Sequence, residues 1–432
     1  MSMTEGGKMV TARNLLFLSV AIAFVPQELS ANVRENQFAA GTVSAALGGT
    51  GIAGLNNPAA TYLNPAALAR CYRNQVELGI KFLSTQFTVT GSANAVDQLG
   101  DLLVSEIGAC LTPLSGLGFG MWASTGISKP LAIELTTQNE NITFSRFGKD
   151  LSSPTMMLGV GYGFLPELSL GFGFSLAMHS EVSQDVYAPL TNSAKPFFTG
   201  LSARVRPRGS VVAGLLVQPI DFIELGAKFQ TANFGIFNVN ASTKSAAFGF
   251  DIPAIIVALE GVSDYSPRQY GFGVNVKPWD SLKILADLSY ALWSDYSGPF
   301  LVASPDPNSA ISSGIKLPVL ENYSFRDIFI PKIGLEWNFS ELSSLRAGYS
   351  FHPAIIEVPK GKTNLIDTDN HNVSIGSGFH AQWGMVAYHV DIFVGLQLLA
   401  KNTVQKSVDY GAEAYTFSGI AGSSGLSAGL EF

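Results

Sequence analysis

Strict alternation of apolar side chains with small or polar ones is the sequence feature that most constrains how this chain folds. It is clearest at residues 168–177, which read LSLGFGFSLA, and it recurs at residues 282–292 and 345–351. Within 282–292 only Leu285 is out of phase. Because successive side chains of a strand point to opposite faces, each segment has one apolar face and one face of small or polar groups. The pattern is typical of membrane-spanning strands, with lipid on one side and a lumen on the other.

The composition agrees with a chain that buries much of its surface in a membrane. Only 14% of its 432 residues are charged, and the mean hydropathy is +0.25. The sequence has no run of about 18 or more apolar residues, the length that a transmembrane helix needs. Every backbone N–H and C=O in hydrocarbon requires an internal partner, which only helices and closed barrels provide. The sequence therefore predicts an all-β fold, a transmembrane antiparallel β-barrel.

Residues 1–31 are predicted to be a signal peptide. Lys8 and Arg13 precede an apolar stretch from Leu15 to Val25, and Leu29-Ser30-Ala31 follows it. The apolar stretch is too short to span a membrane and suits the core of an export signal. We therefore expect three regions: a signal peptide (1–31), an N-terminal plug in the lumen (32–70), and a barrel with its extracellular loops (71–432).

Turn-forming residues divide the barrel region into hairpins. Tight turns are expected at 165–167, 219–221, 278–280 and 338–341, and longer loops at 182–207, 232–265, 293–325 and 352–370. The count is about fourteen strands, an even number that places the short turns and the C-terminus in the periplasm. The chain ends on an alternating strand at Phe432, which resembles the assembly signal of outer-membrane barrels. The barrel-assembly machinery is therefore an expected partner.

The predicted plug is rich in Gly, Ala and Asn and does not alternate. Residues Gly49 to Gly54 match the G-x-G-x-x-G pattern of dinucleotide sites, which needs a preceding strand and a following helix. Asn56, Asn57 and Pro58 would break such a helix, so loop packing is the favoured interpretation and no cofactor is expected.

Charged residues of both signs are expected on the lumen face. Their interpretation as a network that braces the wall and the plug is favoured, and a polar conduit or gate is the alternative. The set is Glu224, Lys228, Lys283, Asp287, Lys332, Glu336, Arg346 and Glu431.

Histidines and cysteines give no sign of a metal site. The five histidines lack ligand spacing, although His371 and His380 could meet across one strand. Cys71 and Cys110 are expected near opposite ends of one hairpin arm, so no disulfide is predicted.

Two segments assigned to loops are unusually apolar. Val96, Leu99, Leu103, Ile107 and Cys110 recur at helical spacing, which predicts an amphipathic helix between residues 94 and 111. A second helix is predicted within residues 248–262, with Pro253 in its first turn. Such segments either pack as a cap over the barrel or capture a lipid-like ligand. The candidate ligand-binding residues are Phe250, Ile252, Ile255, Ile256 and Leu259.

Several motifs resemble the FadL/TodX family of outer-membrane transporters of long-chain fatty acids and hydrocarbons. Residues 44–69, SAALGGTGIAGLNNPAATYLNPAALA, are similar to that family's hatch and include Asn64, Pro65 and Ala66. Trp293-Ser294 and Arg346-Ala347-Gly348-Tyr349 resemble its later motifs. The resemblance implies a fourteen-strand barrel, a hatch in the lumen, an extracellular apolar capture groove, and passive diffusion of hydrophobic substrates with sideways exit into the membrane.

One departure from the family concerns the charge of the substrate. No basic residue lies within residues 248–262 to hold a fatty-acid carboxylate, and Lys244 and Arg268 are the nearest. An uncharged hydrocarbon therefore fits the sequence as well as a fatty acid does.

The expected function is passive transport of hydrophobic small molecules across the outer membrane of a Gram-negative-type bacterium, without enzymatic activity or a metal. Expected partners are the ligand, outer-membrane lipid and lipopolysaccharide. The net charge of −7 argues against nucleic acid. One alternative is an accessory barrel of a secretion system, of the PorV type. A membrane-embedded hydrolase is a further alternative, although the sequence shows no G-x-S-x-G motif or other nucleophile–base pair.

Overall fold

The computed structural model describes residues 37–91, 96–97, 101–127, 142–147, 154–176, 180–188, 197–247, 250–298, 300–305, 324–357, 365–405 and 414–432. The predicted signal peptide and residues 32–36 of the predicted plug lie outside this part of the chain. In the part that is described, no helix is both long enough and apolar enough to cross a membrane.

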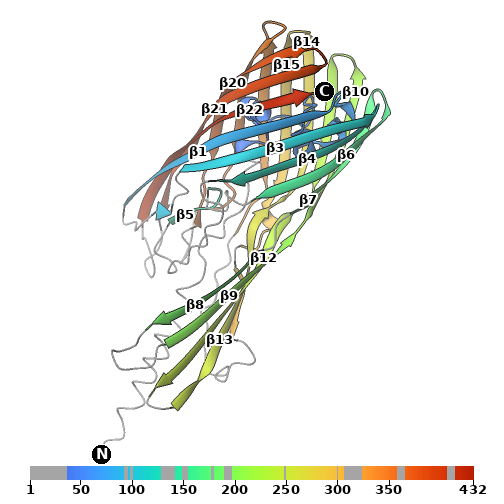
Figure 1. Cartoon of the computed structure of the whole chain (residues 1–432). Coiled ribbons are helices and arrows are strands. Elements are labelled where there is room, and N and C mark those ends of the chain that lie inside the picture. Colours follow the sequence, from blue (N-terminus) through green and yellow to red (C-terminus); the bar gives the residue numbers. More distant parts are fainter. Residues whose placement is uncertain are drawn as a thin grey trace, which may run out of the picture.

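Fourteen antiparallel strands of the described chain form a closed barrel (Figure 1), which confirms the predicted fold class and strand number. In their order around the barrel, the strands are β1 (Gln75–Gly91), β3 (Asp101–Leu114), β4 (Leu117–Gly126), β6 (Thr155–Leu165), β7 (Leu168–Leu176), β10 (Ser210–Ile220), β11 (Ile223–Gln230), β14 (Arg268–Trp279), β15 (Leu282–Leu292), β17 (Ile328–Asn338), β18 (Ser343–His352), β20 (Asn370–Trp383), β21 (Val386–Gln405) and β22 (Ala414–Glu431). Each strand pairs with two neighbours, so the barrel has no exposed edge.

The barrel closes where the last strand pairs with the first. Strand β22 pairs with β1 along the whole of β1, from Gln75↔Glu431 to Gly91↔Tyr415. Beyond this ladder, Phe432 N donates to Asn74 O at 3.0 Å and Asn74 N donates to Phe432 O at 3.2 Å. The C-terminal residue is therefore part of the closing seam.

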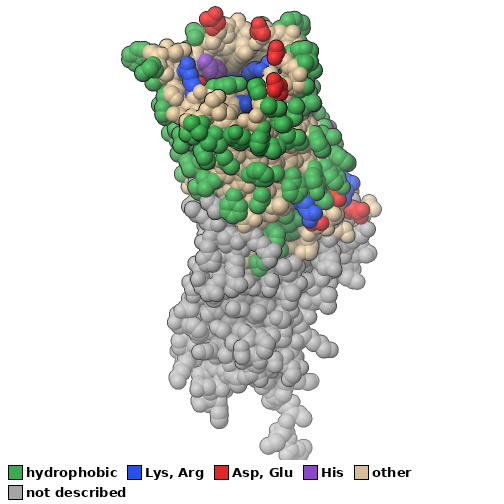
Figure 2. Space-filling view, turned by 90° about the vertical axis from the view of Figure 1, so that its right-hand side faces the viewer, with side chains coloured by type: hydrophobic (Ala, Val, Ile, Leu, Met, Phe, Trp, Pro, Cys, Tyr) green, Lys and Arg blue, Asp and Glu red, His purple; other side chains and the backbone are tan. Residues whose placement is uncertain are grey.

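The alternation seen in the sequence separates the two faces of the wall. In β7, Phe172 on one face is 60% exposed, while Ser169 on the other face is 1% exposed. Figure 2 shows hydrophobic side chains over the outside of the barrel and charged side chains gathered at its rim. The exception, Leu285, faces inward and is buried in one cluster with Leu47 and Leu63. A closed barrel with an apolar outer surface is suited to hydrocarbon.

Short turns join the strands at one end of the barrel, here called the hairpin end. They lie at 115–116, 166–167, 221–222, 280–281, 339–342 and 384–385. The four turns predicted from the sequence are found within two residues of these positions. The C-terminus is at the same end, and the opposite end is called the loop end (Figure 1).

A second sheet extends beyond the barrel at the loop end (Figure 1). Its five strands are β16 (Phe300–Pro305), β13 (Phe250–Ser266), β12 (Asn233–Ala247), β9 (Phe197–Arg208) and β8 (Ser180–Ala188). Only Gly209 separates β9 from β10, and only Pro267 separates β13 from β14. The segments predicted as long loops at 182–207 and 232–265 are therefore largely strands that continue those of the barrel.

The predicted helix within residues 248–262 is wrong, because this segment forms most of β13. Strand β13 pairs with β12 and β16, and its Ile and Val residues suit a paired strand. Pro253 falls where the β12–β13 register shifts, between Thr243↔Ile255 and Ser245↔Ile252. A residue without an N–H is tolerated at such a bulge.

The predicted helix between residues 94 and 111 is also wrong. Residues 101–111 belong to β3, which pairs with β1 and β4, and residues 96–97 form the short strand β2 (Val96–Asp97). Ile107 and Leu111 lie on the outer face, 40% and 50% exposed. A spacing of four residues suits one face of a helix and also one face of a strand, because four is a multiple of two. Strand β2 pairs with β5 (Ile142–Phe144), and β5 pairs with β19 (Leu365–Ile366).

Deletion of Phe432 should lower the amount of folded barrel in the outer membrane several-fold. The deletion removes both backbone hydrogen bonds to Asn74 and an aromatic side chain that is 57% exposed beside the seam. The measurement is the fraction of outer-membrane protein that migrates differently on a denaturing gel before and after boiling. Phe339→Ala, a change at an exposed aromatic residue in a turn away from the seam, is the matched control. Full assembly without Phe432 would show that the seam closes without its last residue.

Candidate functional site

Residues 37–70, here called the N-terminal segment, touch strands all around the barrel. The segment contains α3 (Thr42–Ala46), α4 (Ala60–Leu63) and the 3-10 helix η1 (Pro65–Arg70). Helix η1 contacts β4, β6, β7 and β10, and α3 contacts β18, β20, β21 and β22. The wall residues involved belong to the buried face of the strands. The N-terminal segment therefore lies within the ring of strands.

The motif Asn64-Pro65-Ala66 joins the N-terminal segment to the wall. Asn64 Oδ1 accepts a hydrogen bond from Ala66 N at 3.1 Å, which caps η1, and Pro65 is the first residue of η1. Asn64 Nδ2 donates to Ile52 O at 2.8 Å and to Leu215 O of β10 at 3.1 Å. One side chain therefore links the 3-10 helix, the preceding loop and the barrel wall.

Glycines in the wall make this close approach possible. A Cβ at Gly214 would lie 2.0 Å from Asn64 Oδ1, and a Cβ at Gly171 would lie 2.2 Å from Ala66 N. Any side chain at these positions would displace the motif. Inward glycines in strands next to a segment of irregular backbone are a sequence signal that could have identified the docking surface.

The glycine-rich loop of the N-terminal segment donates its backbone amides to wall carboxylates. Gly51 N and Ile52 N donate to Asp287 Oδ2 at 2.8 and 3.1 Å, and Gly54 N donates to Glu224 Oε1. Gly51 and Gly54 have φ values of +146° and +85°, which glycine adopts readily. Aspartate and glutamate thus accept the backbone amides that would bind a phosphate in a dinucleotide site, so these amides are already satisfied by the protein itself.

Lysines of the wall bind the carbonyl oxygens of the same segment. Lys228 Nζ donates to Tyr62 O at 2.7 Å, Lys332 Nζ to Gly49 O at 3.0 Å, and Lys81 Nζ to Ala39 O at 2.8 Å. Lys81 was not among the predicted lumen charges. Its place in the alternation could have identified it, because Lys81 lies between the lipid-facing Ile80 and Phe82 of β1 and therefore faces the lumen.

The remaining predicted lumen charges pair within the wall. Glu336 contacts Lys283 at 2.6 Å and Arg346 at 2.7 Å, and Arg346 contacts Asp391 at 2.5 Å. Glu431 Oε1 lies 4.0 Å from His389 Nδ1. The predicted set therefore divides into one group that holds the N-terminal segment and one group that links neighbouring strands. These contacts favour the structural interpretation over the conduit.

The lumen face changes character along the barrel. On β1 the inward residues Glu77 and Lys81 lie toward the hairpin end, whereas Leu83, Phe87 and Val89 lie toward the loop end. At the loop end these residues belong to a group that we call the loop-end apolar cluster. Its buried members are Phe38, Leu83, Phe87, Leu102, Val104, Phe144, Phe147, Ile366, Leu399, Val404, Tyr415, Phe417 and Ala421. Water-filled barrels have polar interiors, so an apolar lumen face is an unusual feature.

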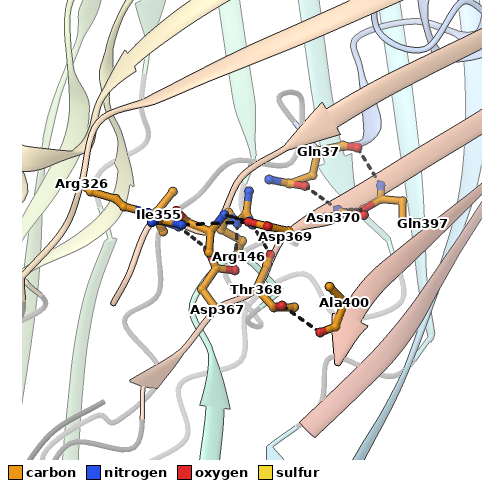
Figure 3. A network of polar contacts seen from close by, with 11 residues as sticks. Gln37, Arg146, Arg326, Ile355, Asp367, Thr368, Asp369, Asn370, Gln397 and Ala400 are labelled. Atoms are coloured by element: carbon orange, nitrogen blue, oxygen red, sulfur yellow. Dashed lines mark hydrogen bonds and ion pairs between the residues drawn. The ribbon is translucent and has the colours of Figure 1, made fainter. Parts of the chain in front are cut away.

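Polar side chains lie between this cluster and the rest of the N-terminal segment. Gln397 Nε2 donates to Gln37 O at 2.7 Å, and Asn370 Nδ2 donates to Gln397 Oε1 at 2.7 Å (Figure 3). Phe38 follows Gln37 and is itself a member of the cluster, 6.3 Å from Phe147 between ring centroids. The first described residues of the N-terminal segment therefore meet the apolar cluster directly.

A buried ion pair adjoins the same cluster in the chain, because Arg146 precedes Phe147 and Asp367 follows Ile366. Figure 3 shows the two paired side chains. Arg146 Nε lies 3.0 Å from Asp367 Oδ1, and Arg146 Nη2 donates to Thr368 O at 2.8 Å. The two side chains are 1% and 0% exposed. Burial raises the pKa of Asp367, and the Arg146 guanidinium opposes this rise. Arg146 Nη1 is buried and has no hydrogen-bond partner in the described part of the protein.

A groove of about 480 Å³ opens next to this ion pair. Thr368 and Ala400 line it, and they directly follow Asp367 and Leu399 in the chain. Arg326, Asp369 and Lys401 also line the groove, together with the apolar Ile356. It therefore has both apolar and charged walls beside the loop-end apolar cluster.

The candidate ligand-binding residues from the sequence are all on β13, in the second sheet beyond the barrel, here called the outer sheet. Strand β13 pairs with β12 and β16, and neither of these strands carries a residue of the loop-end apolar cluster. Ile255 pairs with Thr243 and Ile256 with Ser242 of β12, and Leu259 pairs with Val239 and with Ala303 of β16. The single helical face expected to unite Ile255, Ile256 and Leu259 does not form. A second aromatic group, which was not predicted, includes Tyr265, Trp293 and Tyr296. Tyr265 stacks on Tyr296 with 4.3 Å between ring centroids.

Two expectations about histidine and cysteine positions are corrected by the structure. His371 and His380 are both on β20, and the His380 ring instead lies 5.9 Å from the ring of His389 on β21, measured between centroids.

Cys71 and Cys110 are not at opposite ends of an arm: both belong to one buried cluster. The cause is that Cys71 lies four positions before Gln75, the first residue of β1, and Cys110 pairs with Gln75. Within the described residues, no group of His, Cys, Asp or Glu could hold a metal ion.

Known proteins share this architecture. No protein-family model matches the chain. Alkane uptake protein A of Marinobacter nauticus is 21% identical over 366 residues, which are 78% of this chain and 77% of that protein. The crystal structure of a Pseudomonas aeruginosa FadL homologue matches with a TM-score of 0.59 and 14% identity, covering 91% of this chain and 97% of that one. The toluene transporter TodX of P. putida matches with a TM-score of 0.56 and 18% identity, covering 91% and 98%.

Asp287→Ala and Glu224→Ala should each loosen the N-terminal segment. Each change removes a carboxylate that accepts backbone amides of residues 51–54, and hydrogen bonds to charged groups contribute about 1.5–3 kcal/mol. Single-channel conductance in planar bilayers should rise in both variants. Lys283→Ala, which loses only a contact to Glu336 of the wall, is the matched control and should leave conductance unchanged. Equal conductance in all three variants would mean that these carboxylates do not hold the segment in place.

Proposed function

We propose that this chain, which has the fold of FadL- and TodX-type barrels, is a passive channel for hydrophobic small molecules such as long-chain fatty acids or hydrocarbons. It acts in the outer membrane of a Gram-negative-type bacterium, where lipid and lipopolysaccharide surround the barrel. The alkane uptake activity named for the M. nauticus relative and the toluene transport named for TodX support this substrate class. The proposed activity is transport, and no catalytic step is assigned to any residue.

The observation that carries the proposal is the loop-end apolar cluster. Polar groups line the lumen of a barrel that conducts water or ions. Buried Phe, Leu and Tyr side chains on the lumen face are not suited to such an aqueous path. An apolar solute gains roughly 25 cal/mol for each Å² that it removes from water. In this proposal a solute at the loop end contacts side chains such as Phe87, Leu102 and Phe417, which are packed against one another in the described structure.

The N-terminal segment acts in this proposal as the plug expected from the sequence. Its backbone is irregular, and wall carboxylates and lysines satisfy its amides and carbonyls. Such backbone is tolerated at membrane depth where protein surrounds it. Phe38 connects the segment to the apolar cluster, so a ligand that enters the cluster contacts the plug at its first described residues.

Arg146 extends the substrate class to amphiphiles that carry a carboxylate. Arg146 lies between the cluster residues Phe144 and Phe147 in the chain, its side chain is buried, and its Nη1 atom has no partner in the described structure. A guanidinium can pair with a carboxylate through more than one N–H. A fatty acid would place its chain in the apolar cluster and its carboxylate at Arg146, while an alkane would use the cluster alone.

The outer strand β13 remains a proposed capture surface. Phe250, Ile252, Ile255, Ile256 and Leu259 are apolar residues in a sheet that extends beyond the barrel. A hydrophobic solute that reaches the protein from outside would meet this sheet before the lumen. In this proposal the outer sheet captures the solute and the loop-end apolar cluster binds it.

Leu102→Ser and Phe417→Ser should each weaken binding of a hydrophobic probe about tenfold. Loss of a buried apolar side chain removes about 1.5–3 kcal/mol of favourable burial, and 1.4 kcal/mol is roughly a factor of ten. The measurement is titration of the purified barrel with a fluorescent long-chain fatty acid, together with uptake of labelled hexadecane by cells. Phe325→Ser, in the separate group around Trp293, is the matched control. Similar losses in all three variants would assign the cluster a purely structural role.

The same titration tests the outer strand through Ile255→Ser, Ile256→Ser and Leu259→Ser combined. If β13 captures substrate, cellular uptake falls while binding to the purified barrel is retained. Unchanged uptake would exclude β13 from the route.

Arg146→Gln should separate the two substrate classes. The variant keeps a hydrogen-bond donor but lacks the charge, so palmitate binding should weaken by about tenfold or more while hexadecane binding changes little. The measurement is competition of each compound against the fluorescent probe. If both compounds lose affinity equally, Arg146 serves only to hold Asp367 and the neighbouring loop.

A further inference from the structure

The only two cysteines of the chain are neighbours in the folded protein. Cys71 is the C-terminal cap of η1, four positions before Gln75, the first residue of β1. Cys110 is on β3 and pairs directly with Gln75. Both lie at the hairpin end, where the N-terminal segment passes into the barrel wall.

Their surroundings bury the two side chains together, away from solvent. The side chains are 2% and 0% exposed, in a cluster that includes Ala66, Leu68 and Leu216. The Cys71 thiol donates to Asn56 O at 3.5 Å, and Gln75, which pairs with Cys110, donates from Nε2 to the same oxygen at 3.5 Å. A disulfide needs two Cβ atoms that lie close together, and both side chains are buried in the same small cluster.

We propose that Cys71 and Cys110 form a disulfide that ties the end of the N-terminal segment to strand β3. The proposal rests on the outer-membrane location given above, because an exported chain passes through an oxidising compartment. The two thiols lose two protons and two electrons as the S–S bond forms. A protein disulfide of a periplasmic thiol oxidase takes up the electrons by thiol–disulfide exchange and becomes a dithiol.

The bond forms before the barrel closes. The interaction with the Cys110 side chain and burial raise the pKa of the Cys71 thiol, so little thiolate is present once the barrel has folded. In the unfolded exported chain both thiols are accessible. Because there are two cysteines, only one intramolecular pairing exists and no rearrangement is needed.

The disulfide restricts which part of the N-terminal segment can move. It encloses residues 72–109, which include all of β1, the strand that closes the barrel with β22. Residues next to Cys71, including η1, stay attached to the wall. Any opening of the lumen must then come from residues nearer Phe38, which meet the loop-end apolar cluster.

The thiol state of the full-length protein from outer membranes tests the proposal. Thiols are blocked with N-ethylmaleimide in denaturant, and newly released thiols are then labelled with a polyethylene glycol maleimide with or without prior reduction. We expect two labels on each chain after reduction and none before it. Cys71→Ser and Cys110→Ser should each have a single thiol that N-ethylmaleimide blocks, so reduction should add no label.

Two free thiols blocked by N-ethylmaleimide in the wild-type protein would overturn the proposal and leave the pair as small buried apolar groups. A second readout is the temperature at which heat-modifiability is lost. Reductant present during refolding should lower it for the wild type and have no effect on the double variant Cys71→Ser/Cys110→Ser. Equal effects on both proteins would also contradict the bond. Fractionation of the cells reports the location separately, so a protein found outside the outer membrane contradicts the proposed function and not the pairing chemistry.

Discussion

Backbone hydrogen bonding in a medium without water is the constraint on which the rest of this structure depends. The pairing of β22 with β1, completed by the bonds between Phe432 and Asn74, leaves no strand of the barrel with a free edge. Once the ring is closed, each strand has one face toward lipid and one toward the lumen. The positions of all inward side chains follow from that closure, including the charges and the apolar cluster.

The N-terminal segment meets the same constraint by different means. Its short helices and glycine-rich loop leave amides and carbonyls that no strand pairs with, and a segment inside a barrel has little access to water. Asp287 and Glu224 accept the amides of residues 51–54, while Lys228 and Lys332 donate to carbonyls. Charged wall residues therefore gain partners that satisfy them, which offsets the cost of burying them. This explains why both signs of charge occur in the lumen of a chain with few charges overall.

The sequence predicted the features that depend on local periodicity and missed those that depend on register between strands. Alternation at residues 168–177 was sufficient to place β7, because one residue in two had to face lipid. The spacing of Leu103 and Ile107 was ambiguous, and pairing with β1 and β4 decided it. The lumen charges were predicted as a group, but which of them meets Asp391 or Gly51 depends on strand stagger. The contact between Cys71 and Cys110 was missed for the same reason, since it arises from the β1–β3 register.

The lumen face of β1 changes from apolar at Phe87, at the loop end, to charged at Glu77, toward the hairpin end. This change in polarity affects the rate at which a solute moves along the strand. A solute held by aromatic and aliphatic side chains gives up those contacts as it advances, so the bound position is a free-energy well followed by a climb. A protein without an energy source cannot change the overall equilibrium between the two sides of the membrane. A deeper well fills at lower external concentration but empties more slowly, so flux saturates early. Selection for scavenging a scarce solute would favour larger apolar groups at the loop end, and selection for rapid flux would favour smaller ones.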